Sequence, residues 1–260
     1  MGYQNVAIEQ TIYHEKLITG KNKDPIPEPI NLDELIAKTN KKLRLFNRLT
    51  IAYSDPSITF ITAKSLNYKK YHLVAALPLT DAAYQHSCQS FQGDIITYNS
   101  NTIRFRLSRK IYYVAIKRNM FFEIKYAPVI LNSQERRATI TKSQQYHMVG
   151  KSKSIIISSE AKNKFQLRGV YDVANLGLIF GLSEEQAKSS ISSLCKKLLL
   201  SADCRILGRT PVLLRFEDVS TSESSDENED EEMDTIVSSN KRQNSLEKSA
   251  EKPNKKAKSS

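Results

Sequence analysis

The sequence predicts an α/β domain in which parallel strands alternate with helices and curl into a (β/α) barrel. Short apolar runs recur along the chain, and the stretches between them begin with residues that cap helices. Most of these runs are continuously apolar, which is typical of parallel strands covered on both faces. About seven runs favour a barrel or distorted barrel over an open doubly wound sheet. The chain has no glycine-rich phosphate loop of the nucleotide-binding kinds.

Seven segments are expected to form strands. They are Val6–Ile8, Leu49–Tyr53, Leu73–Leu77, Ile95–Tyr98, Ile103–Arg106, Phe121–Ile124 and Ile155–Ile157. The segment Ile103–Arg106 alternates polar and apolar residues, which predicts a half-buried or edge strand. Within it, Arg104 and Arg106 share one face, whereas Phe105 and Leu107 are expected to face the core.

Helix starts with capping residues lie between the strands. Asn31 precedes a helical stretch in which Glu34 is placed to complete a capping box. Thr80 is expected to cap the helix that follows it, and Ser133 is expected to open a helix that contains Glu135.

The last helices are predicted in the same way. Asp172 is expected to cap Val173–Phe180, and Gly181 to end that helix in the left-handed conformation. Ser183 then begins a helix whose apolar face is formed by Ala187, Ile191, Leu194 and Leu198.

The charge is distributed unevenly along the chain. The 260 residues carry a net charge of +11, but residues 217–260 hold 12 acidic and 7 basic residues. The remaining 216 residues therefore hold 32 basic and 16 acidic residues, a net charge of +16. A domain this basic repels itself unless a polyanion neutralises it, and nucleic acid is the commonest such partner.

The composition also excludes some classes of protein. No run of eighteen apolar residues is present, so no membrane-spanning helix is expected. The cysteines, Cys88, Cys195 and Cys204, lack the spacing of a zinc site or redox pair, which fits a reducing cell interior.

The composition changes near residue 217, which predicts two regions: residues 1–216 as the barrel domain and residues 217–260 as a disordered tail, first acidic and then basic. Two basic clusters in the tail are separated by 12 residues, a spacing typical of bipartite nuclear import signals. They consist of Lys241, Arg242, Lys255, Lys256 and Lys258. A tail that only aids solubility is the alternative.

Several segments resemble one known family, the thirty-kilodalton protein subunit of nuclear ribonuclease P. The most specific runs from Leu167 to Leu178 and into Phe180–Ser183, and it is similar to the family signature RGPYDVANL…GLS. Arg48–Ile51, followed by Ser54–Pro56, resembles a second signature. Further similar segments follow in the expected order, so that the resemblance covers Tyr3 to Leu199. They are Val114–Ile116 with Arg118, Phe122–Glu123, Arg136–Arg137 and Ile155–Ser159.

The resemblance implies a barrel related to the polymerase-and-histidinol-phosphatase phosphoesterases, used as a protein cofactor of a catalytic RNA. In such an assembly the RNA, acting with Mg²⁺, removes the 5′ leader of precursor tRNA, and the protein has no cofactor of its own. Implied partners are the ribonuclease P RNA, precursor tRNA, a small RRM-like subunit and other ribonuclease P or MRP proteins. A nuclear, nucleolar location is implied as well.

The chain departs from the family pattern in three places. It opens at what would be the second strand of the family, so the first strand and helix are missing and Val6–Ile8 is expected to present an open edge. Val170 stands where proline is usual in the signature, and Lys117 and Asn119 flank Arg118 where the family has Asp and Gly.

Catalysis by the protein itself is not expected. The related phosphoesterases hold two or three metal ions with a His-x-His pair and further ligands. The four histidines of this chain, His14, His72, His86 and His147, are not paired at that spacing.

Function is expected to reside in the basic side chains. The candidate RNA contacts are Arg48, Arg104, Arg106, Arg109, Lys110, Arg118, Arg136, Arg137 and Arg168, several of them at predicted strand ends or helix starts. Asp172 is expected to serve as a cap that also orients Arg168. Tyr112 and Tyr113, beside the cationic run, are expected to pack in the core rather than to stack on bases.

Two functions of different class remain open. In the first, the chain is an RNA-binding subunit of ribonuclease P. In the second, it is a truncated paralogue that binds a partner subunit without RNA. RNA affinity that falls steeply with salt distinguishes the first from the second.

Overall fold

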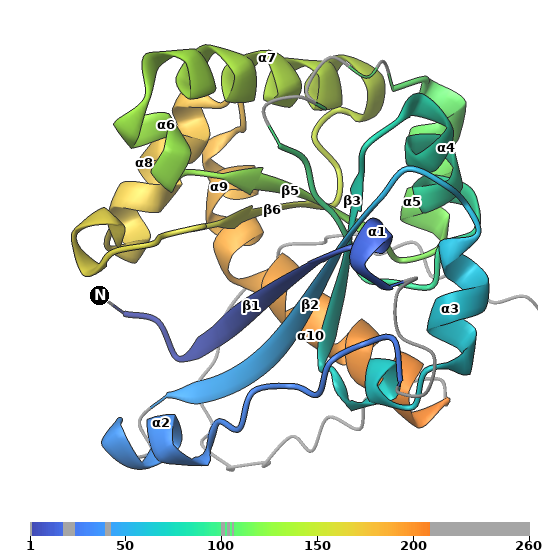
Figure 1. The fold of residues 1–260 in the computed structure, drawn as a ribbon. Helices are drawn as coiled ribbons and strands as arrows, with labels where there is room; N and C mark the ends of the chain where they lie inside the picture. Colours follow the sequence, from blue (N-terminus) through green and yellow to red (C-terminus); the bar gives the residue numbers. More distant parts are fainter. Residues whose placement is uncertain are drawn as a thin grey trace, which may run out of the picture. The chain divides into compact units, whose positions relative to one another are not determined.

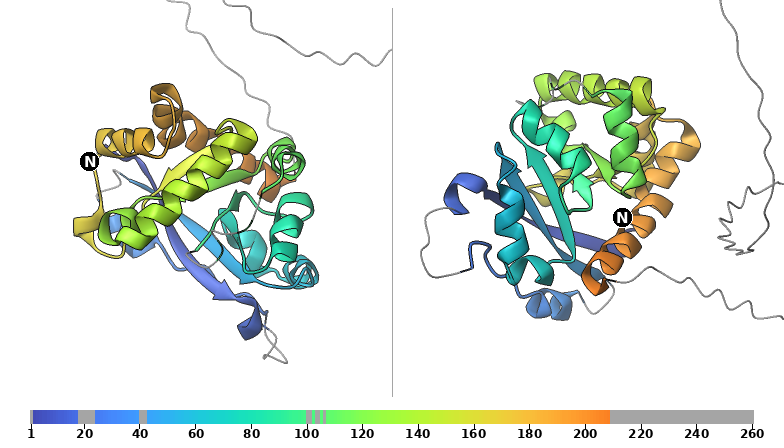
Figure 2. Two further views of the ribbon diagram at one scale, coloured as in Figure 1. Left: turned by 90° about the horizontal axis from the view of Figure 1, so that it is seen from above. Right: turned by 90° about the vertical axis from the view of Figure 1, so that its right-hand side faces the viewer.

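The described part of the chain is built around six parallel strands. The computed structural model describes residues 2–17, 24–39, 43–99, 102, 105 and 107–208. The strands are β1 (Asn5–Tyr13), β2 (Arg44–Tyr53), β3 (Leu73–Pro78), β4 (Ile95–Ile96), β5 (Phe121–Lys125) and β6 (Ile155–Ser158). They lie in the order β1-β2-β3-β4-β5-β6, each parallel to its neighbour. The sheet curls into a half-barrel flanked by helices (Figures 1 and 2), so the predicted fold class is confirmed.

Six of the seven predicted strands are present, with altered lengths. The segment Ile103–Arg106 lies largely outside the described residues, because only Phe105 of the four is described, and Phe105 belongs to no strand. Its backbone N–H donates to the carbonyl of Thr102 at 3.2 Å, as in a turn. Phe105 and Leu107 nevertheless pack against the core as predicted.

The helices follow the strands in the alternation that the sequence predicts. They are α1 (His14–Leu17), α2 (Asp33–Lys38), α3 (Ile58–Lys64), α4 (Asp81–Gln89), α5 (Arg109–Lys117), α6 (Ala127–Leu131), α7 (Ser133–Gly150), α8 (Val170–Ile179), α9 (Glu184–Ile191) and α10 (Ser193–Leu207). Two short 3₁₀ turns, η1 (Asn67–Lys70) and η2 (Lys164–Gln166), lie in connections. No helix among these is long and apolar enough to span a bilayer.

The two faces of the sheet pack differently. On one face, alternate residues of β2 such as Leu49, Ile51 and Tyr53 join a large core with α3, α4, α5, α7 and α8. On the other face, Leu198 and Ala202 of α10, orange in Figure 1, cover the starts of β3 to β6. Beyond α10, this second face carries buried charged residues instead of an apolar core.

Three predicted helix starts behave as follows. Thr80 caps α4 by accepting the N–H of Ala83 at 3.2 Å, as predicted. Ser183 caps α9 and forms a capping box with Gln186. Ser133 opens α7 as predicted, and the preceding residue, Asn132, provides the cap.

The caps of α2 and α8 also differ from expectation. The Asn31 side chain accepts the N–H of Asp33 at 2.9 Å, but Leu32 occupies the cap position and no capping box forms. Asp172 was wrongly predicted as the cap of α8. The helix begins at Val170 with Gly169 as its cap, which places Asp172 in the first turn, where its negative charge is favourable. Gly181 adopts the left-handed conformation at φ +82°, as predicted.

The single helix predicted after Ser183 is broken at Ser192. The backbone of Ser192 leaves the helical region, with φ −117° and ψ −84°, and α10 begins at the next residue. The apolar stripe is divided as a result: Ala187 belongs to the core on one face of the sheet, and Leu198 to the core on the other. The break therefore lets one stretch of chain pass from one face to the other.

Strand β1 is an edge of the described sheet. Its nine residues pair with β2 alone, and most of its side chains are exposed or half-buried. The segment before β1 reaches the start of α8, because a Cβ atom on Gly2 would lie 3.3 Å from Val170 Cγ2. The open edge predicted for this strand is thus present in the described residues.

Candidate nucleic-acid interface

Five predicted cationic contacts lie on the carboxyl-terminal side of the sheet. Arg109 and Lys110 begin α5, the helix that follows β4. Arg136 and Arg137 lie near the start of α7, after β5, and Arg168 lies two residues before α8, after β6. In a parallel sheet, each of these connections starts where a strand ends, so all five residues gather on one side, where sites in α/β folds usually form.

These five side chains are exposed and available to an anion. None of them takes part in an ion pair among the described residues. Arg136 also makes two structural contacts near the end of α6, since its guanidinium donates to the carbonyls of Val129 at 2.9 Å and Ile130 at 3.4 Å. The positive ends of α5 and α7 add to the field of the side chains that begin them.

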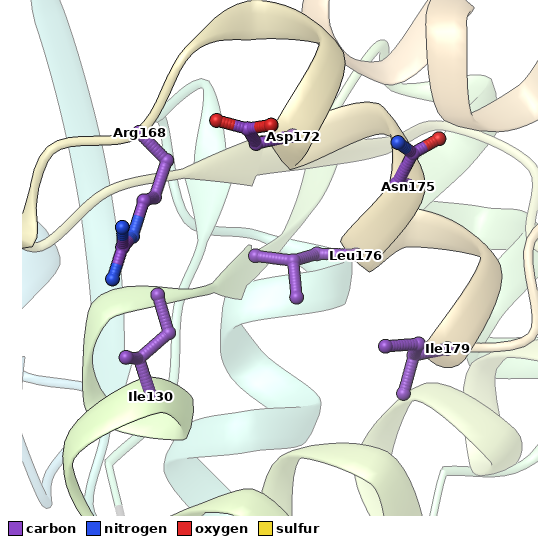
Figure 3. A pocket seen from close by; sticks show the side chains of 6 residues that line it. All are labelled: Ile130, Arg168, Asp172, Asn175, Leu176 and Ile179. Atoms are coloured by element: carbon purple, nitrogen blue, oxygen red, sulfur yellow. The ribbon is translucent and has the colours of Figure 1, made fainter.

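Arg168 borders a hollow between α6 and α8 (Figure 3). The hollow has a volume of about 430 Å³ and an apolar wall formed by Ile130, Leu176 and Ile179. Asp172 and Asn175, one and two turns along α8, place polar groups on the same rim. The backbone N–H of Arg168 donates to the Tyr126 hydroxyl at 3.3 Å, which fixes the chain beside the hollow.

The predicted ion pair between Asp172 and Arg168 is absent from the ion pairs of the described residues. The Arg168 guanidinium extends toward Ile130 and away from the Asp172 carboxylate (Figure 3). The guanidinium is therefore not held by this carboxylate.

Arg48 does not belong with the exposed cations. It is only 6% exposed, on the charged face of the sheet, and its guanidinium forms a two-pronged pair with Glu123 of β5. Glu9 of β1 lies 3.5 Å away as a second carboxylate. Burial opposes ionisation of Glu123, but the charge and hydrogen bonds of Arg48 outweigh it and lower the pKa of that carboxyl. Since these carboxylates occupy the guanidinium, we remove Arg48 from the RNA-contact set.

Arg118 also has a structural role. It lies in the turn between α5 and β5, on the amino-terminal side of the sheet, whereas the five exposed cations lie on the carboxyl-terminal side. Its guanidinium donates to the carbonyls of Cys88 at 3.0 Å and Phe91, and so satisfies the end of α4. Burial lowers the pKa of this guanidinium. The Arg118 guanidinium, like that of Arg48, is therefore engaged by contacts within the fold.

The remaining RNA contacts and the nuclear import residues that the sequence predicts fall outside the described residues. These are Arg104 and Arg106 in the connection before α5, and Lys241, Arg242, Lys255, Lys256 and Lys258 in residues 217–260.

The charged face of the sheet continues beyond Arg48. Lys125, at the end of β5, is buried and pairs with Glu160 at 2.8 Å, and Thr50 donates to Glu9 at 2.5 Å. Within the described ranges, no three His, Cys, Asp or Glu side chains are grouped so that they could hold a metal ion. The acids of this face are instead neutralised by the basic side chains next to them.

The aromatic residues divide into buried and exposed ones. Tyr112 is fully buried and stacks on Phe122 with ring centroids 4.4 Å apart, so its predicted core role is confirmed. Sequence reasoning missed Phe165, which is 81% exposed in the connection between β6 and α8. The signal available in the sequence was its place between Lys164 and Arg168, a short basic stretch with one aromatic residue.

Comparisons with known proteins find relatives of similar sequence. The sequence model of the family described as RNase P subunit p30 matches residues 1–207. The Mus musculus protein named ribonuclease P protein subunit p30 is 32% identical over 214 residues, covering 79% of this chain and 78% of that protein. The Saccharomyces cerevisiae protein named ribonuclease P/MRP protein subunit RPP1 is 26% identical over 211 residues, covering 79% of this chain and 70% of that protein.

A solved structure has a similar fold. A chain in the cryo-EM structure of archaeal ribonuclease P with mature tRNA superposes with a TM-score of 0.57 and 15% identity. The match covers 86% of this chain and 92% of that chain. At this identity, the likeness concerns the fold alone.

Proposed function

The chain belongs to the RNase P subunit p30 family, and from this premise we propose that it is an RNA-binding subunit of a ribonuclease P ribonucleoprotein. In that assembly the RNA removes the 5′ leader of precursor tRNA, with Mg²⁺ as the RNA's metal ion. The protein neutralises phosphates and holds the RNA in its active shape. The observation that carries the proposal is the set of five exposed cations without ion pairs on the carboxyl-terminal side of the sheet, in the described residues.

The physical role of these cations follows from their chemistry. Arginine presents a planar fork of donors that matches a phosphate, and it stays charged at any physiological pH. Phosphate contacts position an RNA without reading its sequence, which suits a protein that supports a catalytic RNA.

The wider assignments belong to the same proposal. The yeast relative is named as a subunit of both ribonuclease P and ribonuclease MRP, which supports a role of this chain in both particles. Partners are then the ribonuclease P RNA, precursor tRNA, a small RRM-like subunit and other ribonuclease P or MRP proteins. The place of action is the nucleus and nucleolus, which the basic clusters of residues 241–258 support.

Salt dependence of RNA binding tests the proposed interface. If the five cations each neutralise one phosphate of single-stranded RNA, log K should fall against log salt concentration with a slope of about −3.5. Replacing Arg109, Lys110, Arg136, Arg137 and Arg168 by glutamine should weaken binding and make this slope shallower. Fluorescence anisotropy at salt concentrations from about 50 to about 300 mM measures both the affinity and the slope.

A matched control uses exposed lysines that already have partners. Lys70 pairs with Glu28 at 3.0 Å and Lys188 with Glu184 at 2.7 Å, so Lys70→Gln with Lys188→Gln should leave the slope nearly unchanged. Equal slopes for the five-residue variant and the wild type would refute this interface.

Assembly is tested by recovery of the whole chain from nuclear extract. The precipitate is expected to contain ribonuclease P RNA and to cleave precursor tRNA. Recovery of subunit proteins without RNA or cleavage would instead favour the second candidate, an interaction module that binds a partner protein without RNA. The open edge of β1 is the observation that favours that candidate, because unpaired strand edges recruit partner chains.

A further inference from the structure

The connection between β6 and α8 displays an aromatic ring to solvent. Phe165 is 81% exposed, although the residues on either side of the connection are anchored. A single exposed apolar side chain is ordinary in a folded protein. Phe165 differs from such cases in two respects, which are the rigidity of its turn and the charge around it.

Local hydrogen bonds fix the turn that carries Phe165. The side-chain oxygen of Gln166 accepts the N–H groups of Lys162 at 2.7 Å and of Asn163 at 3.4 Å. The N–H of Gln166 donates to the carbonyl of Asn163 at 3.0 Å, which closes the 3₁₀ turn η2. Three residues after Phe165, the hydrogen bond from the Arg168 N–H to the Tyr126 hydroxyl fixes the chain again. The ring is thus held outward by its own backbone, so little ordering entropy remains to oppose binding.

The surroundings of Phe165 are cationic. Lys164 Nζ lies 5.2 Å from the centre of the Phe165 ring, and Lys162 and Arg168 flank it in the sequence. The one acid at the start of the connection, Glu160, is already engaged by Lys125 at 2.8 Å. The ring therefore lies among basic side chains, with Leu167, 38% exposed, as an apolar neighbour. Lysine is depleted at protein interfaces, so these surroundings suit nucleic acid better than a protein partner.

We propose that Phe165 stacks on an unpaired base of RNA, while Lys164 and Arg168 bind the phosphates on either side of that base. An aromatic ring flanked by cations is the usual platform for single-stranded nucleic acid, because every base has a face that can stack. This inference rests on the proposed function and deepens it: RNA is held by the five exposed cations and is gripped at Phe165 where its bases are unpaired.

The test is binding of a single-stranded RNA that carries one 2-aminopurine to the full-length chain. Phe165→Ala should weaken binding about ten-fold and abolish the quenching of 2-aminopurine fluorescence that stacking produces. Phe165→Trp should keep both the affinity and the quenching, since indole offers a larger stacking surface. The salt slope should stay that of the wild type, because no cation has been removed.

Phe60 provides a matched control. It is 73% exposed on α3, without the basic stretch that surrounds Phe165, so Phe60→Ala should leave affinity and quenching unchanged. Both replacements affect exposed side chains, and circular dichroism checks that each variant is folded.

The outcomes separate this inference from the proposed function. If the wild type binds RNA with a steep salt slope but Phe165→Ala binds equally well, stacking is refuted and the proposed function stands. If the wild type shows no salt-dependent RNA binding, the proposed function fails together with the inference. If Phe165→Ala keeps its RNA affinity but loses a subunit protein from the precipitate, Phe165 contacts protein and the inference is wrong.

The unpaired base can come from the ribonuclease P RNA or from precursor tRNA. Titrating the wild type and Phe165→Ala with each transcript separately distinguishes these sources. The transcript whose affinity falls about ten-fold in the variant supplies the base. An equal affinity of both proteins for both transcripts would overturn the inference.

Discussion

Replacing Glu123 by alanine is expected to lower the free energy of unfolding by about 3 to 5 kcal/mol, because it leaves a buried guanidinium without its main partner. Glu123 is fully buried and Arg48 is 6% exposed, so water cannot solvate the charge that remains. Glu9, 3.5 Å from the guanidinium and partly exposed, supplies one remaining carboxylate, which places the expected loss near the lower end of this range. Urea denaturation followed by circular dichroism measures the change.

Two controls separate the loss of the partner from the loss of volume. The double replacement Arg48→Met with Glu123→Leu removes both charges and is expected to be less destabilising than Glu123→Ala. Lys70→Ala breaks an exposed pair with Glu28 and should change stability by less than about 1 kcal/mol. A Glu123→Ala variant as stable as Lys70→Ala would show that the buried pair does not support the fold.

The second large effect is a rise in stability with pH that depends on Lys142. This lysine of α7 is 1% exposed, and its Nζ lies 5.0 Å from the centre of the Tyr84 ring and 5.5 Å from that of Tyr146. It donates to the carbonyl of Phe105 at 3.3 Å. Burial lowers the pKa of its ammonium group to about 8, although the Cys88 thiol and Asp81 act in the opposite direction.

The sign of the effect follows from proton binding. Below pH 8, Lys142 is protonated in both the folded and the unfolded chain. Between pH 8 and its ordinary value of 10.5, the unfolded chain keeps the proton and the folded chain does not, so the free energy of unfolding rises with pH. The rise is on the order of 2 kcal/mol between pH 8 and pH 10, from at most about 1.4 kcal/mol per pH unit.

The measurement compares the wild type with Lys142→Met by urea denaturation from pH 7 to pH 10. Burial raises the pKa of Cys88 to about 12 and that of Tyr84 as well, and both groups lower stability as the pH rises. These contributions are largely shared by the two proteins, so the difference between the curves isolates Lys142. Parallel curves over this range would contradict the assignment.

The strands could be predicted because each one is specified by a run of residues that are consecutive in the sequence. Continuous apolar runs such as Leu73–Leu77 and Ile155–Ile157 become strands since both faces of the sheet are covered near α10. Strand β1 was predicted too short for a related reason. Glu9, Gln10 and Thr11 look unlike a strand, but they lie at an edge where one face of the sheet is charged and the other half-buried.

The candidate site was predicted less well, because the use of a charge depends on distant residues. Nothing next to Arg48 in the sequence shows that its partner is Glu123, 75 residues away. Arg118 likewise reaches carbonyls at the end of α4 and just after it, 30 and 27 residues earlier. The exposure of Phe165 depends on how a turn is held, which an amino-acid pattern does not reveal. The sequence therefore shows where the arginines are. It does not show which of them make contacts within the fold and which remain free to bind a ligand.

The neighbour-to-neighbour order of the sheet has a consequence for synthesis. Each strand pairs with the one that left the ribosome just before it, so the sheet can grow from β1 to β6 without waiting for a later segment. Each addition requires the closure of one crossover only, which keeps the entropic barrier of every step small. Bonds of long sequence separation then fasten a sheet that already exists: Arg205 bonds to His72, 133 residues away, and to Asp94, 111 residues away, and Arg48 pairs with Glu123. A nascent chain halted after β3 would thus already hold two of the five strand pairings of the described sheet in native register.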